Sequence, residues 1–192
     1  EPTVEGVLER GPRLARAVWR WRMQLAGLSA VGGVALVLCA GWSWLPREAT
    51  SEYCVAVLAV GNGSTSLALV PGGEAAIVDA GTIRNLDAGD VAVQALGTLD
   101  ARRLGPAFVS HANFDHFSGL ESLAERRPPA EVLFNPYAWA LRRSNVDMGR
   151  LTDGLAARGV PCGTVAAGER VLLGGGWFEV LWPPADLDAA QW

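Results

Sequence analysis

Residues 51–81 contain short apolar runs, rich in β-branched residues and separated by turn-forming residues. The runs at 53–60, 67–70 and 75–78 end in the turn sequences GNGS, PGG and DAG. Short apolar runs bounded by glycine, proline, asparagine and aspartate are typical of β-strands joined by tight turns. The sequence therefore predicts a meander of three antiparallel strands.

Helical and strand patterns alternate after this meander. Residues 87–99 begin with capping aspartates and carry apolar residues at Val91, Ala95 and Leu96, which predicts a helix. Further helices are predicted at 119–126 and 147–158, and strands at 106–109, 131–134, 170–173 and 177–181. Alternating strands and helices indicate a layered α/β arrangement. The stretch after residue 50 is long enough for one domain with its own hydrophobic core, but not for two full domains.

Residues 23–45 contain no charged side chain. As a helix they would extend for about 34 Å, against about 30 Å for the hydrocarbon core of a bilayer. Five arginines precede the segment and Arg47 follows it, so the positive-inside rule places residues 1–22 in the cytoplasm. A cleaved signal peptide is the competing interpretation, but its apolar core would be unusually long. The pattern favours one transmembrane helix with an extracytoplasmic domain at 51–192.

Charge is distributed unevenly along the chain, whose formal net charge is −4. Residues 1–22 carry five arginines and three glutamates, whereas the remainder carries 11 arginines and 17 acidic residues. An acidic domain is a poor general binder of nucleic acid, because that affinity comes mainly from neutralising phosphates. Three arginine pairs, at 102–103, 126–127 and 142–143, allow a local basic patch, although solvated helix ends and loops explain each pair as well.

The chain contains no lysine, and this excludes lysine-based chemistry. Its three cysteines, Cys39, Cys54 and Cys162, have no zinc-knuckle or CxxC spacing. Outside the cytoplasm, a disulfide between Cys54 and Cys162 is one alternative. Two independent buried thiols are the favoured interpretation.

The candidate chemistry lies at residues 110–120, which read SHANFDHFSGL. This stretch holds both histidines of the chain, His111 and His116, with Asp115 directly before the second. It follows a predicted buried strand and leads into a predicted helix, so its polar side chains share one tight loop. Imidazole and carboxylate groups in one loop are typical of a metal site.

The order of these elements and motifs resembles the first half of the metallo-β-lactamase fold, and in particular the C-terminal domain of ComEC-like proteins, the membrane channel proteins of bacterial DNA uptake. Their segment VGQGDS corresponds to residues 60–65, their strand end IDGG to 78–81, and their metal loop SHxDxDHxGGL to 110–120. In that family the domain follows a last transmembrane helix, here residues 23–45. The resemblance covers residues 23–184 and implies the N-terminal half of an αββα fold.

The resemblance also implies ligands for two divalent ions, zinc or manganese. His111 would bind the first ion with Asn113 as a co-ligand, and Asp115 and His116 would bind the second. Two such ions would share an activated hydroxide. The resemblance also implies Asp115 as the catalytic residue. Asp79 would either orient a ligand from behind the site or serve as a turn residue.

The sequence departs from the family pattern in three ways. Asn113 replaces the usual aspartate or histidine, and an amide oxygen is a weaker ligand than carboxylate or imidazole. Ser64 replaces the acidic residue of VGQGD. The chain has no third histidine, although the second half of the fold supplies one, so we interpret it as a fragment of a longer domain.

Several functions remain open at this stage. The resemblance implies a metal-dependent phosphodiesterase or nuclease at the cell membrane that acts on incoming single-stranded DNA, with other competence or channel proteins as partners. The alternatives are a catalytically degenerate structural or binding module of the channel, and an unrelated membrane-bound hydrolase of small esters or lactones.

Two further groups of residues have structural interpretations. Trp139, Trp177 and Trp182 are predicted to pack in the core or against the sheet rather than form a binding surface. Gly61, Gly63 and Ser64 are predicted to form a tight turn rather than a phosphate site, because no suitable helix N-terminus follows them.

Overall fold

The computed structural model describes residues 32–33 and 51–186 of the chain. The chain divides into two compact units, Glu1–Glu48 and Ala49–Trp192, and the second contains the elements described below. Its main sheet has six strands in the order β1-β2-β3-β4-β5-β6, and a separate two-stranded sheet pairs β7 with β8. The strands are β1 (Cys54–Val57), β2 (Thr65–Val70), β3 (Glu74–Ala80), β4 (Arg103–Val109), β5 (Glu131–Phe134), β6 (Cys162–Thr164), β7 (Arg170–Leu173) and β8 (Gly176–Glu179).

The first three strands form the predicted antiparallel meander. Strand β1 pairs antiparallel with β2, and β2 pairs antiparallel with β3. The turn between β2 and β3 uses Gly72 and Gly73 with φ of 98° and 82°, values that glycine adopts without a Cβ clash. The meander prediction is confirmed.

The remaining strands of the main sheet are parallel, and helices connect them. Strand β3 pairs parallel with β4, β4 with β5, and β5 with β6. Parallel strands need a crossover, and helices supply it here. The helices are α3 (Ala88–Thr98), α4 (Phe114–Phe117), α5 (Leu120–Arg126), α6 (Pro136–Leu141) and α7 (Val146–Ala157). Asp87 caps α3 through its side chain, as the sequence predicts.

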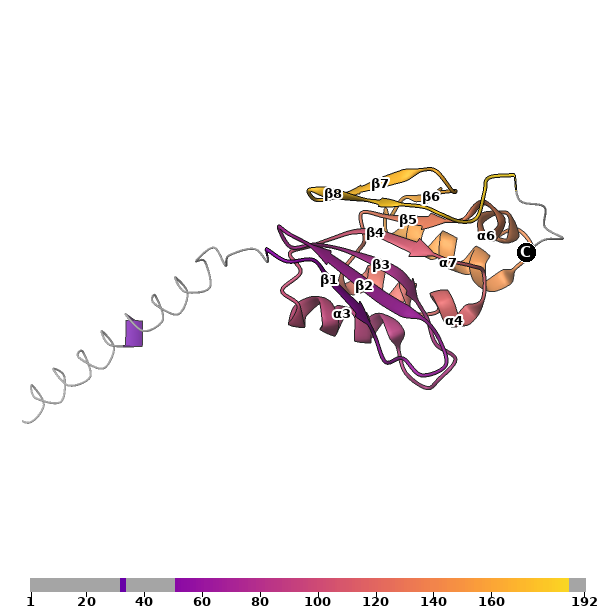
Figure 1. Ribbon diagram of the computed structural model, residues 1–192. Helices are drawn as coiled ribbons and strands as arrows, with labels where there is room; N and C mark the ends of the chain where they lie inside the picture. Colours follow the sequence, from indigo (N-terminus) through magenta and orange to yellow (C-terminus); the bar gives the residue numbers. More distant parts are fainter. Residues whose placement is uncertain (1–31, 34–50, 187–192) are drawn as a thin grey trace, which may run out of the picture. The chain divides into compact units, whose positions relative to one another are not determined.

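The two faces of the main sheet have different covers. Helices lie on one face, and the β7–β8 hairpin lies over the other (Figure 1). Successive side chains of a strand point to opposite faces of the sheet, so each strand contributes to two separate cores. Leu67, Ile77 and Ala107 belong to the helix-side core, whereas Val70 and Ala76 pack with Leu173 of the hairpin.

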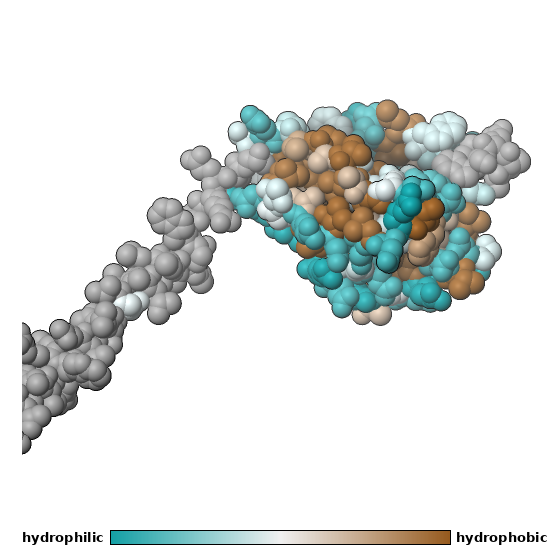
Figure 2. Space-filling view, turned by 90° about the horizontal axis from the view of Figure 1, so that it is seen from below, coloured by the Kyte–Doolittle hydropathy of each residue, from teal (hydrophilic) through white to brown (hydrophobic). Residues whose placement is uncertain are grey.

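The hairpin covers only part of its face of the sheet. Tyr53, Val55 and Val57, in and beside β1, are 72%, 77% and 82% exposed. The space-filling view shows a continuous hydrophobic area bordered by polar residues (Figure 2). Apolar area of this kind on a surface is typical of contact or binding sites.

The expected fold class, an α/β half-fold preceded by a transmembrane helix, was wrong. The unit is mixed α/β with a six-stranded sheet, and no helix of the described residues is long and apolar enough to cross a membrane. The longest of these helices, α7, has 12 residues and extends for about 18 Å, against about 30 Å for a bilayer core. The segments 1–22 and 23–45 lie outside the described residues, apart from Gly32 and Gly33.

The two cysteines in the described part of the chain are free thiols. Cys54 lies in β1 and Cys162 in β6, the two edge strands of the main sheet. The interpretation as independent thiols is therefore confirmed, although both are half-buried rather than fully buried. Cys39 lies outside the described residues.

Candidate functional site

The candidate loop lies at the carboxyl ends of the parallel strands. Asp79 is near the end of β3, Ser110 directly follows β4, and Asn135 directly follows β5. The pairing of Val78 with Phe108 brings Asp79 level with the start of the loop. In α/β sheets this edge is where ligands usually bind.

Two backbone segments, Gly63–Ser64 and Gly81, pack tightly beneath the loop. A Cβ atom on Gly81 would lie 2.5 Å from the Asp115 carbonyl carbon and from the His116 nitrogen, and one on Gly63 would lie 2.1 Å from the Gly81 oxygen. The Ser64 N–H donates to the Asp115 carbonyl at 3.1 Å. Residues 61–64 therefore form a support for the loop, in agreement with their interpretation as a turn.

Asp79 joins this support to the histidines. Its side chain is 3% exposed and its φ is 59°, in the left-handed region. Its carboxylate accepts hydrogen bonds from the Ser110 N–H at 2.8 Å, from the Ser110 hydroxyl at 2.8 Å and from His116 Nδ1 at 2.7 Å. Asp79 thus combines both expected roles, because it occupies a special backbone conformation and orients a histidine.

These hydrogen bonds determine which imidazole nitrogens carry protons. A carboxylate only accepts, so the Ser110 hydroxyl and His116 Nδ1 both donate to Asp79. The Ser110 hydrogen is thereby used, and its oxygen must accept from His111 Nδ1 at 3.0 Å. Each neutral histidine therefore leaves Nε2 unprotonated, which is the form that binds a metal.

The same contacts exclude a serine-hydrolase relay between Ser110, His116 and Asp79. In such a relay the serine and the carboxylate contact opposite nitrogens of the ring. Here Ser110, at 3.2 Å, and Asp79, at 2.7 Å, both contact Nδ1 of His116. Ser110 is thus an orienting group rather than an activated nucleophile.

Asp115 and His116 present donor atoms to the same side. Nε2 of His116 lies 3.9 Å from Oδ2 of Asp115. Two atoms that bind one zinc ion at about 2.1 Å lie within about 4.2 Å of each other. The pair therefore fits a shared ion in both chemistry and spacing, with Asp79 behind the histidine.

The other predicted ligands are placed less favourably. The ring centroids of His111 and His116 are 3.7 Å apart. Asn113 is exposed and precedes α4, but its side chain makes no capping hydrogen bond. Within residues 32–33 and 51–186, no group of three or more His, Cys, Asp or Glu side chains is arranged to hold a metal ion.

Burial lowers the pKa of His111 from its ordinary value of 6.5, and the neighbouring His116 lowers it further. The carboxylates of Asp79 and Asp115 oppose this shift. A lowered pKa keeps the imidazole of His111 neutral at neutral pH, the form in which it accepts a metal.

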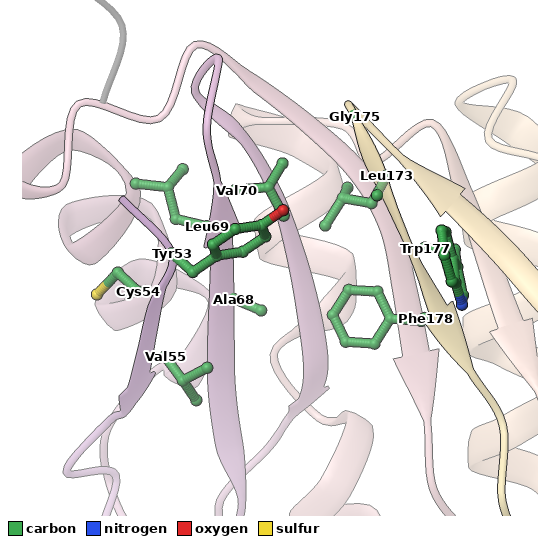
Figure 3. A pocket seen from close by; sticks show the side chains of 11 residues that line it. Tyr53, Cys54, Val55, Ala68, Leu69, Val70, Leu173, Gly175, Trp177 and Phe178 are labelled. Carbon is green, nitrogen blue, oxygen red and sulfur yellow. The ribbon is translucent and has the colours of Figure 1, made fainter. Parts of the chain in front are cut away.

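A predominantly apolar cavity of about 460 Å³ opens beside His111. Its lining includes Ser110 and His111 of the loop and residues 178–183 of the segment that begins in β8. A second apolar cavity, of about 370 Å³, lies between β1–β2 and the hairpin, and none of its lining residues belongs to the loop (Figure 3). Phe178 lines both cavities and packs on Phe108 at 5.4 Å.

Asn135 is a structural residue of the site that the sequence analysis missed. It is 4% exposed, its side-chain N–H donates to the Ser110 carbonyl, and its Oδ1 accepts from the Ala138 N–H at 2.7 Å. An asparagine followed by proline after a strand is a helix-start signal that predicts this capping role.

The tryptophan predictions were partly wrong. Trp139 is half-buried and packs on Phe134 at 5.5 Å, as predicted. Trp177 and Trp182 are 57% and 62% exposed. Trp177 lines the cavity over β1–β2 and Trp182 lines the cavity beside His111, and both cavities are open to solvent.

No protein-family model matches the chain, and no curated protein matches it either. The geometry of the loop and its motif are therefore the basis for inferring function.

Proposed function

We propose that this chain is a metal-dependent hydrolase whose site is the loop of residues 110–116. The observation that carries the proposal is the chain of contacts through one histidine. Asp79 binds Nδ1 of His116 at 2.7 Å, and Nε2 of the same ring faces Asp115 at 3.9 Å. A carboxylate behind a histidine and a second donor in front of it are typical of metal sites.

The residues of the loop have distinct tasks. His116 Nε2 and the Asp115 carboxylate would hold the ion, zinc or manganese, with His111 Nε2 beside them. The ion, when bound, lowers the pKa of a coordinated water and polarises the substrate. Asp79 and Ser110 hold the imidazoles in the tautomer that the ion requires, and the half-exposed Asp115 carboxylate accepts the proton that the attacking water loses.

DNA as the substrate depends on the resemblance to ComEC-like proteins alone. The arginine pairs of the sequence do not add to it. Arg103 pairs with Glu74 at 3.3 Å and Arg126 with Asp90 at 2.6 Å, and the Arg142 guanidinium lies 3.9 Å from the ring centroid of Trp139. Such contacts compete with phosphate for the guanidinium groups.

A binding module with a degenerate site is the second candidate. The exposed amide of Asn113 and the lack of a three-donor group in the described part of the chain favour it. In that case the loop would hold an ion weakly and the domain would serve as a scaffold.

Calorimetric titration of the full chain with zinc or manganese tests the site. We expect His116→Gln and Asp115→Asn to weaken binding about 10- to 100-fold. Glu125→Gln is the matched control, because it removes an exposed carboxylate of α5 outside the loop, and it should bind as the wild type does. Equal binding in all variants would refute the site.

Activity measurements on the same variants distinguish the hydrolase from the binding module. Metal-dependent cleavage of a phenyl ester or a phosphodiester, lost in Asp115→Asn, supports the hydrolase. Metal binding without cleavage of either substrate favours the module.

A further inference from the structure

The cavity beside His111 has apolar walls from two parts of the fold. Val78, Phe108 and Leu133 line it from the main sheet. Phe178 of β8, with Trp182 and Pro183 of the segment after β8, forms its wall. Its volume of about 460 Å³ lies in the range of small-molecule sites. The wall is held in place by backbone hydrogen bonds, among them the Ala167 N–H to the Pro183 carbonyl at 2.8 Å.

The charge of this cavity is unsuited to a polyanion. Among the described residues, no arginine lines it, and the lining groups that ionise are His111 and Glu179. Glu179 accepts a hydrogen bond from Arg170 at 3.0 Å, so its charge is already paired. A site for a nucleic-acid backbone needs cationic groups that neutralise phosphate, and the described lining supplies none.

The cavity borders the candidate metal site. Ser110 and His111 belong both to its lining and to the loop. A molecule whose apolar part fills the cavity therefore presents its polar part to His111. The polar side chain of Asn135, which also lines the cavity, is already bonded to Ser110 and Ala138.

We propose that the cavity binds the apolar group of a small uncharged carboxylic ester or lactone. This proposal rests on the proposed hydrolase function and names its substrate class. The reaction adds the oxygen of water to the carbonyl carbon, breaks the bond from that carbon to the ester oxygen, and delivers a proton to the departing alcohol. The aromatic rings of Phe108, Phe178 and Trp182 recognise the apolar group by burial alone, without a charged partner.

Binding to the metal-free full chain tests the substrate class without catalysis. The probe is N-phenylbutanamide, an uncharged amide analogue of an aryl ester that hydrolyses too slowly to interfere. We expect it to shift the indole N–H signal of Trp182 and the ring signals of His111 in a saturable way in NMR spectra. Trp182→Ala should weaken binding about fivefold or more.

Trp177→Ala is the matched control, because Trp177 is similarly exposed but lines only the other cavity. It should leave the affinity for the probe unchanged. Equal losses in the two variants, or no saturable shift at His111 and Trp182, would overturn the proposal. Saturable binding of octathymidylate at the same signals would overturn it as well, and would favour DNA.

Zinc titration of the same samples distinguishes the two proposals. Probe binding without zinc binding would refute the hydrolase and keep the apolar site. Zinc binding without probe binding would refute only the substrate class.

Discussion

The two cavities beside Phe178 have similar, mainly apolar linings but lie at different places on the sheet. The cavity over β1 and β2 lies against the antiparallel meander (Figure 3). The cavity beside His111 lies at the carboxyl ends of parallel strands. Both linings are mainly apolar. Only the second contains loop residues that bear metal-ligating groups.

This difference shows how the topology creates the candidate site. In an antiparallel meander successive strands return through tight turns, so few side chains gather at either edge. Parallel strands all end at the same edge, where their connections start. Asp79, Ser110 and Asn135 come from three such strand ends and meet through hydrogen bonds.

The largest expected effect comes from Gly81→Ala, which adds a side chain directly beneath the loop of residues 110–116. The new Cβ would lie 2.5 Å from backbone atoms of Asp115 and His116, so the loop must move. We expect a loss of about 2–3 kcal/mol in the free energy of unfolding and a loss of zinc binding. Urea denaturation and zinc titration measure the two effects.

Gly97→Ala is the control for that substitution. Nothing lies within 4 Å of a Cβ at Gly97 in helix α3, so it should stabilise the helix by up to about 1 kcal/mol. If Gly81→Ala behaved in the same way, the tight packing beneath the loop would be wrong.

Phe178→Ala removes a side chain that lines both cavities. Because Phe178 is half-buried against Phe108, we expect a smaller loss, about 1–2 kcal/mol. Urea denaturation compares it with Trp177→Ala, an exposed neighbour whose replacement should cost less than about 0.5 kcal/mol. Similar losses in both variants would contradict the packing of Phe178 on Phe108 as a source of stability.

The smallest expected effect is the pH dependence that His111 contributes. Its pKa in the folded chain is lowered, chiefly by burial, so the unfolded chain binds more protons at mildly acidic pH. The stability from His111 is therefore fully present above about pH 6.5 and is lost as the pH falls through the lowered pKa.

NMR titration of the two histidine rings measures this effect, with His111→Gln to assign the signals. Denaturant midpoints should fall less between pH 7.5 and pH 5.5 in that variant than in the wild type. A pKa of His111 at or above 6.5 would contradict the prediction.

Much of the fold follows from local sequence signals. Strand β5 occupies the predicted residues 131–134, and the helix capped by Asp87 forms as expected. Strand β6 was not predicted, because it has three residues and no fully buried side chain. Helix α6 was not predicted either, although Asn135 and Pro136 carry a recognisable start signal.

The site could be predicted only in part. Residues 110–116 attract attention because they hold both histidines. The contact of Asp79 with His116 joins residues 37 positions apart and exists because β3 and β4 pair in parallel. Neither Ser110 as an orienting group nor the apolar cavity follows from the sequence, since both depend on which strand ends meet.

X-ray absorption at the zinc edge tests the central claim most directly. In the full chain with one equivalent of zinc, we predict nitrogen and oxygen ligands at about 2.0–2.1 Å, with imidazole scattering that is lost in His116→Gln. Sulfur ligands at about 2.3 Å, or a spectrum that His116→Gln leaves unchanged, would contradict the metal site at this loop.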